Sequence, residues 1–114
     1  MSLLKSYQVA LLTMTERTRQ EQLRAERKWA PLEEEDYHIL NTVMGEETGE
    51  LSRAILELSR TKTNEETLQV LENLRDEAVQ VAAMGAMIAE KAVAELERMN
   101  KQLADLPSLS ELNS

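Results

Sequence analysis

Two short acidic clusters hold the residue types in this chain that could bind a metal ion. The first spans residues 46–50 (EETGE) and the second residues 76–80 (DEAVQ). In each, a glutamate is followed three residues later by a second oxygen donor, and side chains three apart are neighbours on one face of a helix. Oxygen-only ligands from Glu and Gln favour Mg²⁺, Mn²⁺ or Ca²⁺ over zinc. The clusters therefore indicate a divalent-cation site.

Glu47 and Glu77 stand at positions where the helical pattern would place apolar residues. The two core stripes run along Leu40, Met44, Glu47, Leu51 and Ile55, and along Leu74, Glu77, Val81 and Met84. An ionised carboxylate is costly to bury without a partner, and few basic residues share these faces. A single glutamate of this kind is usually solvated or salt-bridged. Two of them on successive helices, with the same i, i+3 geometry, favour a metal site.

Three helical segments are expected to position these clusters. The first covers residues 3–29 and ends at Ala30, because the residue before Pro31 is pushed out of the helical region. The second covers residues 33–60. The third begins at a capping box formed by Thr63 and Glu66 and continues to about residue 103. It is either one long helix spanning an oligomer, or it splits near Gly85 or after Glu90.

The ends and faces of these helices carry two further expectations. The apolar side of the first helix is clear early and then fades through a polar stretch, so we expect packing by its first half, with the second half facing solvent, a site or a partner. The apolar positions concerned are Leu4, Tyr7, Leu11 and Met14. The second helix should carry four carboxylates in its first turn, where the helix dipole favours them. These are Glu33, Glu34, Glu35 and Asp36.

The composition favours a single all-α domain. The chain has 114 residues, three Gly, two Pro and no Phe, and good helix formers dominate. We expect one helical domain over residues 1–106 and a flexible tail over residues 107–114. The absence of Cys excludes disulfides and thiolate chemistry.

Charge and hydropathy narrow the partners. A net charge of −8 argues against a nucleic-acid binder, which would normally carry a basic stripe. The first twenty residues have no uninterrupted apolar core, so they are a poor signal peptide and no membrane span. We therefore expect a cytoplasmic protein without a membrane or nucleic-acid partner.

At its acidic clusters the sequence resembles the MazG-like, all-α NTP pyrophosphatase superfamily, which carries EExxE on one helix and EExxD on the next. Residues 46–50 fit the first motif in full. Residues 76–80 stand in place of the second, with Asp76 for the first Glu and Gln80 for the final Asp. The stretches ERTRQ (residues 16–20), Lys28-Trp29 and LRDEAVQVAA (residues 74–83) resemble a phage and bacterial branch of this superfamily.

The resemblance implies hydrolysis of an NTP or dNTP to the monophosphate and pyrophosphate, with Mg²⁺ as cofactor and Mn²⁺ as an alternative. It implies a MazG-like helical bundle that assembles as a homodimer or homotetramer, with the two metal-ligand helices packed against each other. The metal ligands would be Glu47, Glu50 and Glu77, with Gln80 replacing the fourth. An amide oxygen brings no charge, so this site would hold metal more weakly or hold fewer ions. Glu46 or Asp76 could orient or deprotonate the attacking water.

Three residues outside the clusters are candidate substrate contacts. Arg53, three residues after Glu50, could reach a phosphate, or it could neutralise nearby carboxylates. Trp29, with Lys28 beside it, could stack on a base, although an isolated Trp is more often a packing anchor. The alternative to an enzyme is a non-catalytic helical assembly, or a nucleotide- or metal-binding module with a degenerate site.

Overall fold

The protein is a three-helix structure with a long helical hairpin at its centre. A computed structural model describes residues 3–105. Its elements are the helices α1 (Leu3–Glu26), α2 (Tyr37–Leu58) and α3 (Asn64–Ala104), with a short 3₁₀ turn, η1 (Leu32–Glu34), between α1 and α2. The prediction of an all-α protein is confirmed, since residues 3–105 contain no strand. The predicted tail over residues 107–114 lies outside the described residues.

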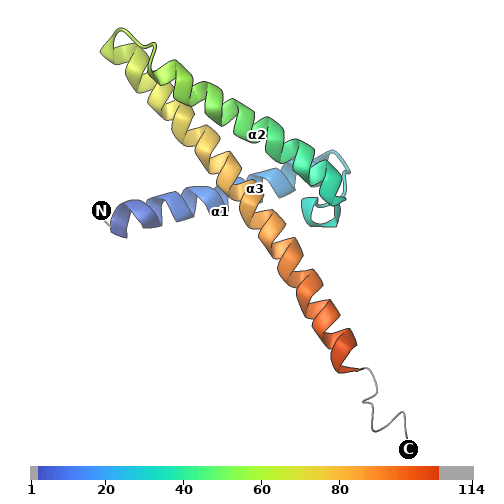
Figure 1. The fold of residues 1–114 in the computed structure, drawn as a ribbon. Coiled ribbons are helices and arrows are strands. Elements are labelled where there is room, and N and C mark those ends of the chain that lie inside the picture. Colours follow the sequence, from blue (N-terminus) through green and yellow to red (C-terminus); the bar gives the residue numbers. More distant parts are fainter. Residues whose placement is uncertain (1–2, 106–114) are drawn as a thin grey trace, which may run out of the picture.

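The arrangement of the helices brings the two acidic clusters together. The helices α2 and α3 lie side by side as an antiparallel hairpin, α1 crosses α3 near its middle, and η1 also packs on α3 (Figure 1). The C-terminal end of α3 extends beyond the other elements (Figure 1). No helix among residues 3–105 has the length and apolar character needed to cross a membrane.

A small apolar core holds the hairpin to η1. Four buried side chains form it, with the partly buried Val43, Met44 and Ile88 packed against them. The four are Leu32, Leu40, Met84 and Met87. Leu40 and Met84 belong to the two apolar stripes that include Glu47 and Glu77. The packing that buries Leu40 and Met84 also turns both glutamates toward the interior, whereas Ile55, at the end of the first stripe, is exposed.

The helix ends are fixed by local hydrogen bonds. The predicted N-cap of α3 is confirmed, because Thr63 accepts a hydrogen bond from the backbone N–H of Glu66 at 3.1 Å. The Glu66 side chain accepts from the backbone N–H of Lys62 at 2.9 Å, one residue before the cap, rather than from Thr63 as in a full capping box. The alternative of a split is also settled, since α3 is one uninterrupted helix of 41 residues. Helix α1 ends at Glu26, three residues earlier than predicted. Lys28 adopts a left-handed conformation (φ 58°), and the N–H of Trp29 reaches back to the carbonyl of Arg24.

The predicted start of α2 at residue 33 was wrong. Pro31 instead begins η1, Glu35 is extended, and Asp36 caps the helix by accepting a hydrogen bond from the N–H of His38 at 2.7 Å. Glu33 and Glu34 therefore lie in η1 rather than in the first turn of α2. The side-chain cap at Asp36 supplies the acceptor that the first helical N–H groups need, so the helix starts there.

The predicted packing of α1 was also reversed. Its first half is exposed, with Tyr7, Leu11 and Met14 between 65 and 68% accessible. Its second half packs across α3, where Arg17 pairs with Glu90 at 2.5 Å. Because charged side chains contribute to the contact between α1 and α3, the apolar periodicity of α1 did not indicate which half of this helix packs on α3.

Candidate metal centre

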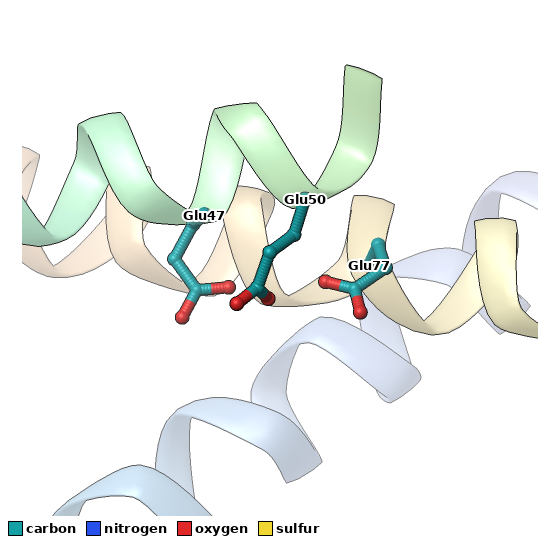
Figure 2. A group of neighbouring side chains, drawn as sticks. All are labelled: Glu47, Glu50 and Glu77. Carbon is teal, nitrogen blue, oxygen red and sulfur yellow. The ribbon is translucent and has the colours of Figure 1, made fainter. Parts of the chain in front are cut away.

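Three carboxylates from α2 and α3 converge at the middle of the hairpin. One oxygen from each of Glu47, Glu50 and Glu77 lies within 4.8 Å of the others. Glu47 and Glu50 are one turn apart on α2, and the antiparallel α3 places Glu77 beside them (Figure 2). The three side chains point toward one another on one side of the hairpin (Figure 2). Helix α1 lies on that side, because its Gln20 lines a hollow together with Glu47.

Two oxygens of this group are buried without a partner. Among residues 3–105, Glu47 Oε2 and Glu77 Oε2 have almost no accessible surface and accept no hydrogen bond. A buried acceptor that is left unpaired is destabilising, and native structures rarely keep one without an ion or water to satisfy it. Two such oxygens within one group of three carboxylates fit a bound cation.

The electrostatics of the group are those of crowded like charges. Burial raises the pKa of the Glu47 carboxyl, and the negative charges of Glu50 and Glu77 raise it further. Burial also raises the pKa of Glu77, with further contributions from a hydrogen bond to Glu50 and from its charge. The repulsion within this group is relieved either when a carboxyl keeps its proton or when a bound cation neutralises the carboxylates. Mg²⁺ and Mn²⁺ accept this all-oxygen donor set.

The structure distributes the other predicted site residues around this group. Arg53 is exposed, and its positive charge lowers the pKa of Glu77, so it lies at the edge of the cluster. Glu46 is exposed on another face of α2, although its charge contributes to the raised pKa of Glu47. Asp76 pairs with Arg75 at 3.0 Å.

Gln80 does not stand apart from the cluster. It is half-buried on α3, one turn after Glu77. Together with Asp76 it lines a hollow of about 430 Å³ between α1 and α3. We refer to this space as the α1–α3 hollow. Gln80 therefore borders an open space one helical turn from Glu77.

Trp29 and Lys28, predicted as a pair, have different surroundings. Trp29 lines a second hollow of about 250 Å³, here called the Trp29 hollow, which Glu47 also lines. The guanidinium groups of Arg24 and Arg27 lie over its ring, at 5.5 and 5.0 Å from the centroid. Lys28 occupies the left-handed position that ends α1 and does not line this hollow.

Sequence reasoning missed three residues of α1 that lie beside the carboxylates. Glu16 is near enough to contribute to the raised pKa of Glu47, and Arg19 interacts with the charge of Glu47. Gln20 keeps a buried Oε1 for which no partner is found among residues 3–105. The available signal was the polar stretch that interrupts the apolar side of α1, which had suggested only that this half faces solvent, a site or a partner.

The arrangement can bind a divalent cation and hold a polar ligand beside it. Three carboxylates supply the charge, and two adjoining hollows supply the space. No family model, curated protein or solved structure matches this chain. The resemblance to the MazG-like superfamily therefore remains a hypothesis that depends on the motifs themselves.

Proposed function

We propose that this protein is a Mg²⁺-dependent nucleoside triphosphate pyrophosphohydrolase of the MazG-like kind, which cleaves an NTP or dNTP to the monophosphate and pyrophosphate. One observation carries the proposal. The helices with the EETGE and DEAVQ motifs bring Glu47, Glu50 and Glu77 together, with two buried oxygens left unsatisfied. A cation bound by carboxylates can support several reactions, and the order and spacing of the two motifs favour nucleotide pyrophosphate hydrolysis among them.

The metal ligands in this proposal are Glu47, Glu50 and Glu77, with Gln80 as a neutral fourth donor. Mg²⁺, or Mn²⁺ in its place, neutralises phosphate charge and lowers the pKa of a bound water. Glu50 is the exposed member of the three and faces incoming ligand, whereas Glu47 and Glu77 are half-buried. The raised pKa values of Glu47 and Glu77 are what cation binding would lower again, since it favours the ionised carboxylates.

A carboxylate beside the metal ligands would orient or deprotonate the attacking water. Asp76 is better placed than Glu46, because it lines the α1–α3 hollow next to Gln80. Its carboxylate is 60% exposed and paired with Arg75, so it is accessible to water. Glu46 is the second candidate for this role.

Trp29 and Arg53 are the proposed substrate contacts. The Trp29 hollow is apolar on the side of Leu23, Val43 and Met84, opens next to Glu47, and suits a flat ring. Arg53 lies at the opposite, Glu77 side of the cluster and can meet phosphate charge. Lys28, outside the hollow, would contribute only long-range positive charge.

The functional unit in this proposal is a homodimer or homotetramer. The described chain leaves large apolar side chains of α1 and α3 in solvent, including Leu11, Leu96 and Leu103. A second copy would cover them, in line with the oligomers that the resemblance implies.

A non-catalytic metal- or nucleotide-binding module is the second candidate. The observation in its favour is Gln80, which stands where the resemblance implies an aspartate. The loss of one negative charge weakens metal binding without removing the three carboxylates. A module of this kind would bind Mg²⁺ and nucleotide without turnover.

A direct assay of pyrophosphate release separates these functions. The wild-type protein, Glu47→Ala and the control Glu57→Ala are incubated with a panel of NTPs and dNTPs and Mg²⁺. Glu57 is an exposed carboxylate on the same helix, outside the cluster. We expect pyrophosphate from at least one nucleotide, a loss of about 100-fold or more in Glu47→Ala, and little change in the control. Activity that survives Glu47→Ala would contradict the proposal, and no pyrophosphate from any nucleotide would favour the binding module.

A further inference from the structure

Arg19 of α1 lines the α1–α3 hollow and interacts with the charge of Glu47, and the proposed chemistry does not yet use it. The hollow is lined by Thr15, Glu16 and Arg19 from α1 and by Asp76 and Gln80 from α3. Residues of both helices connect this hollow to the carboxylate cluster. On α3, Asp76 and Gln80 flank Glu77 in the sequence, and on α1, Glu16 and Arg19 interact with the charge of Glu47.

A two-point hydrogen bond fixes the guanidinium of Arg19. Its Nε and Nη2 donate to the two carboxylate oxygens of Glu16, at 2.7 and 2.5 Å. The Glu16 side chain is 13% exposed and the Arg19 side chain 52% exposed. A shielded carboxylate thus holds a half-exposed guanidinium. Arg has five N–H donors, and this contact uses two, so donors remain for a ligand.

An ordinary surface ion pair does not account for the arrangement of Glu16 and Arg19. An exposed i, i+3 ion pair contributes a few tenths of a kcal/mol at most, and it would normally leave both ends in solvent. Here the acidic end is the shielded one, and Arg19 also interacts with Glu47 across the helix interface. Arg19 interacts with the charge of the half-buried Glu47, as Arg53 does with that of the half-buried Glu77.

We infer that Arg19 binds the polyphosphate end of the metal-bound nucleotide in the α1–α3 hollow, and that Glu16 positions its guanidinium. This inference rests on the proposed function. A guanidinium matches phosphate oxygens in geometry and charge. The carboxylates of Glu16 and Asp76 repel a free polyphosphate, so the site requires Mg²⁺. The nucleotide then lies with its base toward the Trp29 hollow and its phosphates toward Arg19, with the cluster between them.

Calorimetry with pyrophosphate tests the contact without knowledge of the base. Pyrophosphate is titrated into the full-length wild-type protein, Arg19→Gln and the control Arg60→Gln at saturating Mg²⁺, and Mg²⁺ alone is titrated into each. Arg60 is exposed at the end of α2, away from the cluster. We expect Arg19→Gln to weaken pyrophosphate binding about 10- to 100-fold. Mg²⁺ binding should be retained at an affinity no lower than that of the wild type, because a positive charge near Glu47 is removed, and this also shows that the variant is folded. Arg60→Gln should match the wild type in both titrations.

The positioning role of Glu16 is tested by a double-mutant cycle. Glu16→Gln should weaken pyrophosphate binding when Arg19 is present and have no further effect in the Arg19→Gln background. Equal effects of Glu16→Gln in both backgrounds would overturn the positioning role. Unchanged pyrophosphate affinity in Arg19→Gln, with Mg²⁺ binding intact, would overturn the Arg19 contact and leave the proposed function standing. A wild-type protein that binds no Mg²⁺ would overturn the metal site and this inference together.

Discussion

Glu47 and Glu77 combine burial with negative charge, and the two properties oppose each other in the metal-free protein. Each keeps one carboxylate oxygen that no donor among residues 3–105 satisfies. Burial and neighbouring charge raise the pKa of both groups above the ordinary value of 4.5. Residues that bind a cation commonly lower the stability of the metal-free protein, because their like charges repel one another until the cation neutralises them.

The stability cost should be visible in the metal-free protein as a pH dependence. Folding raises the pKa of Glu77, so the folded state binds the proton of this carboxyl more tightly than the unfolded state does. The protonated carboxyl therefore stabilises the fold fully below pH 4.5, and this stabilisation is lost as the pH rises through the raised pKa. In EDTA at pH 7, Glu77→Gln should therefore raise the Tm by about 4 °C, for relief of on the order of 1 kcal/mol of partly screened repulsion. At pH 4 the difference from the wild type should largely vanish.

Thermal unfolding followed by circular dichroism measures whether Glu77→Gln raises or lowers the Tm. Glu57→Gln, which removes an exposed carboxylate of α2, is the control and should shift the Tm little at either pH. With saturating Mg²⁺ the order should reverse, because the variant loses a ligand and with it the stabilisation that binding provides. A Tm for Glu77→Gln below that of the wild type in EDTA at pH 7 would contradict the account of Glu77 as a repelled carboxylate.

Gln80 is the residue at which the second motif departs from the pattern implied by the resemblance. If its side chain is a metal ligand, Gln80→Asp adds a negative charge to the donor set and should retain or increase Mg²⁺ affinity. We expect an increase of about 3- to 10-fold, the range of roughly 1 kcal/mol for one added charge in a partly solvated site. Calorimetric titration with Mg²⁺ measures it. A clear loss of affinity would remove Gln80 from the ligand set.

At the scale of elements, the sequence was a good guide where apolar spacing and capping agreed. The stripes through Leu40 and Met84 predicted the helices that carry the acidic clusters, and their packing accounts for the inward position of Glu47 and Glu77. The capping box at Thr63 predicted the start of α3. These features depend on contacts between residues a few positions apart, which periodicity describes directly.

The sequence was a poor guide to α1 and to the start of α2. The crossing of α1 over α3 includes an ion pair between residues far apart in the chain, Arg17 with Glu90, and no local pattern predicts such a pair. For the same reason Arg19 and Gln20 could not be assigned to the site, although their polar stretch was visible. At the start of α2, Asp36 and the glutamates before it are chemically alike, and only the extended backbone at Glu35 distinguishes the cap.

At the scale of the whole molecule, the single chain exposes more surface than a compact monomer. A folded protein of 13.0 kDa exposes about 6,300 Å². This chain exposes 8933 Å² and has a radius of gyration of 20.3 Å, where about 13 Å is typical for its length. Within residues 3–105, large apolar side chains of α1 and α3 remain in solvent, and oligomer interfaces bury surface of this kind. The exposed part of α3 contributes a continuous apolar side, with Val93, Leu96, Met99 and Leu103 all more than half exposed.

The account therefore predicts an oligomer in solution. Sedimentation equilibrium at micromolar concentration should give twice or four times the chain mass of 13.0 kDa. Leu96→Glu would bury a charge at the interface, at a cost of at least about 2 kcal/mol, and should lower the measured mass. Gln102→Glu adds the same charge at an exposed position outside this apolar side and should leave the mass unchanged. A wild-type monomer at these concentrations would contradict the prediction.

We propose that Glu47, Glu50 and Glu77 together hold a divalent cation. Anomalous diffraction from crystals grown with Mn²⁺ tests this proposal, because the manganese signal locates the ion without reference to any activity. We expect an anomalous peak between the three carboxylates, within about 2.0–2.3 Å of at least one oxygen from each, with the buried oxygens of Glu47 and Glu77 satisfied by the ion or its waters. Crystals with ample Mn²⁺ that show no peak there, and carboxylates that instead share protons with one another, would contradict it.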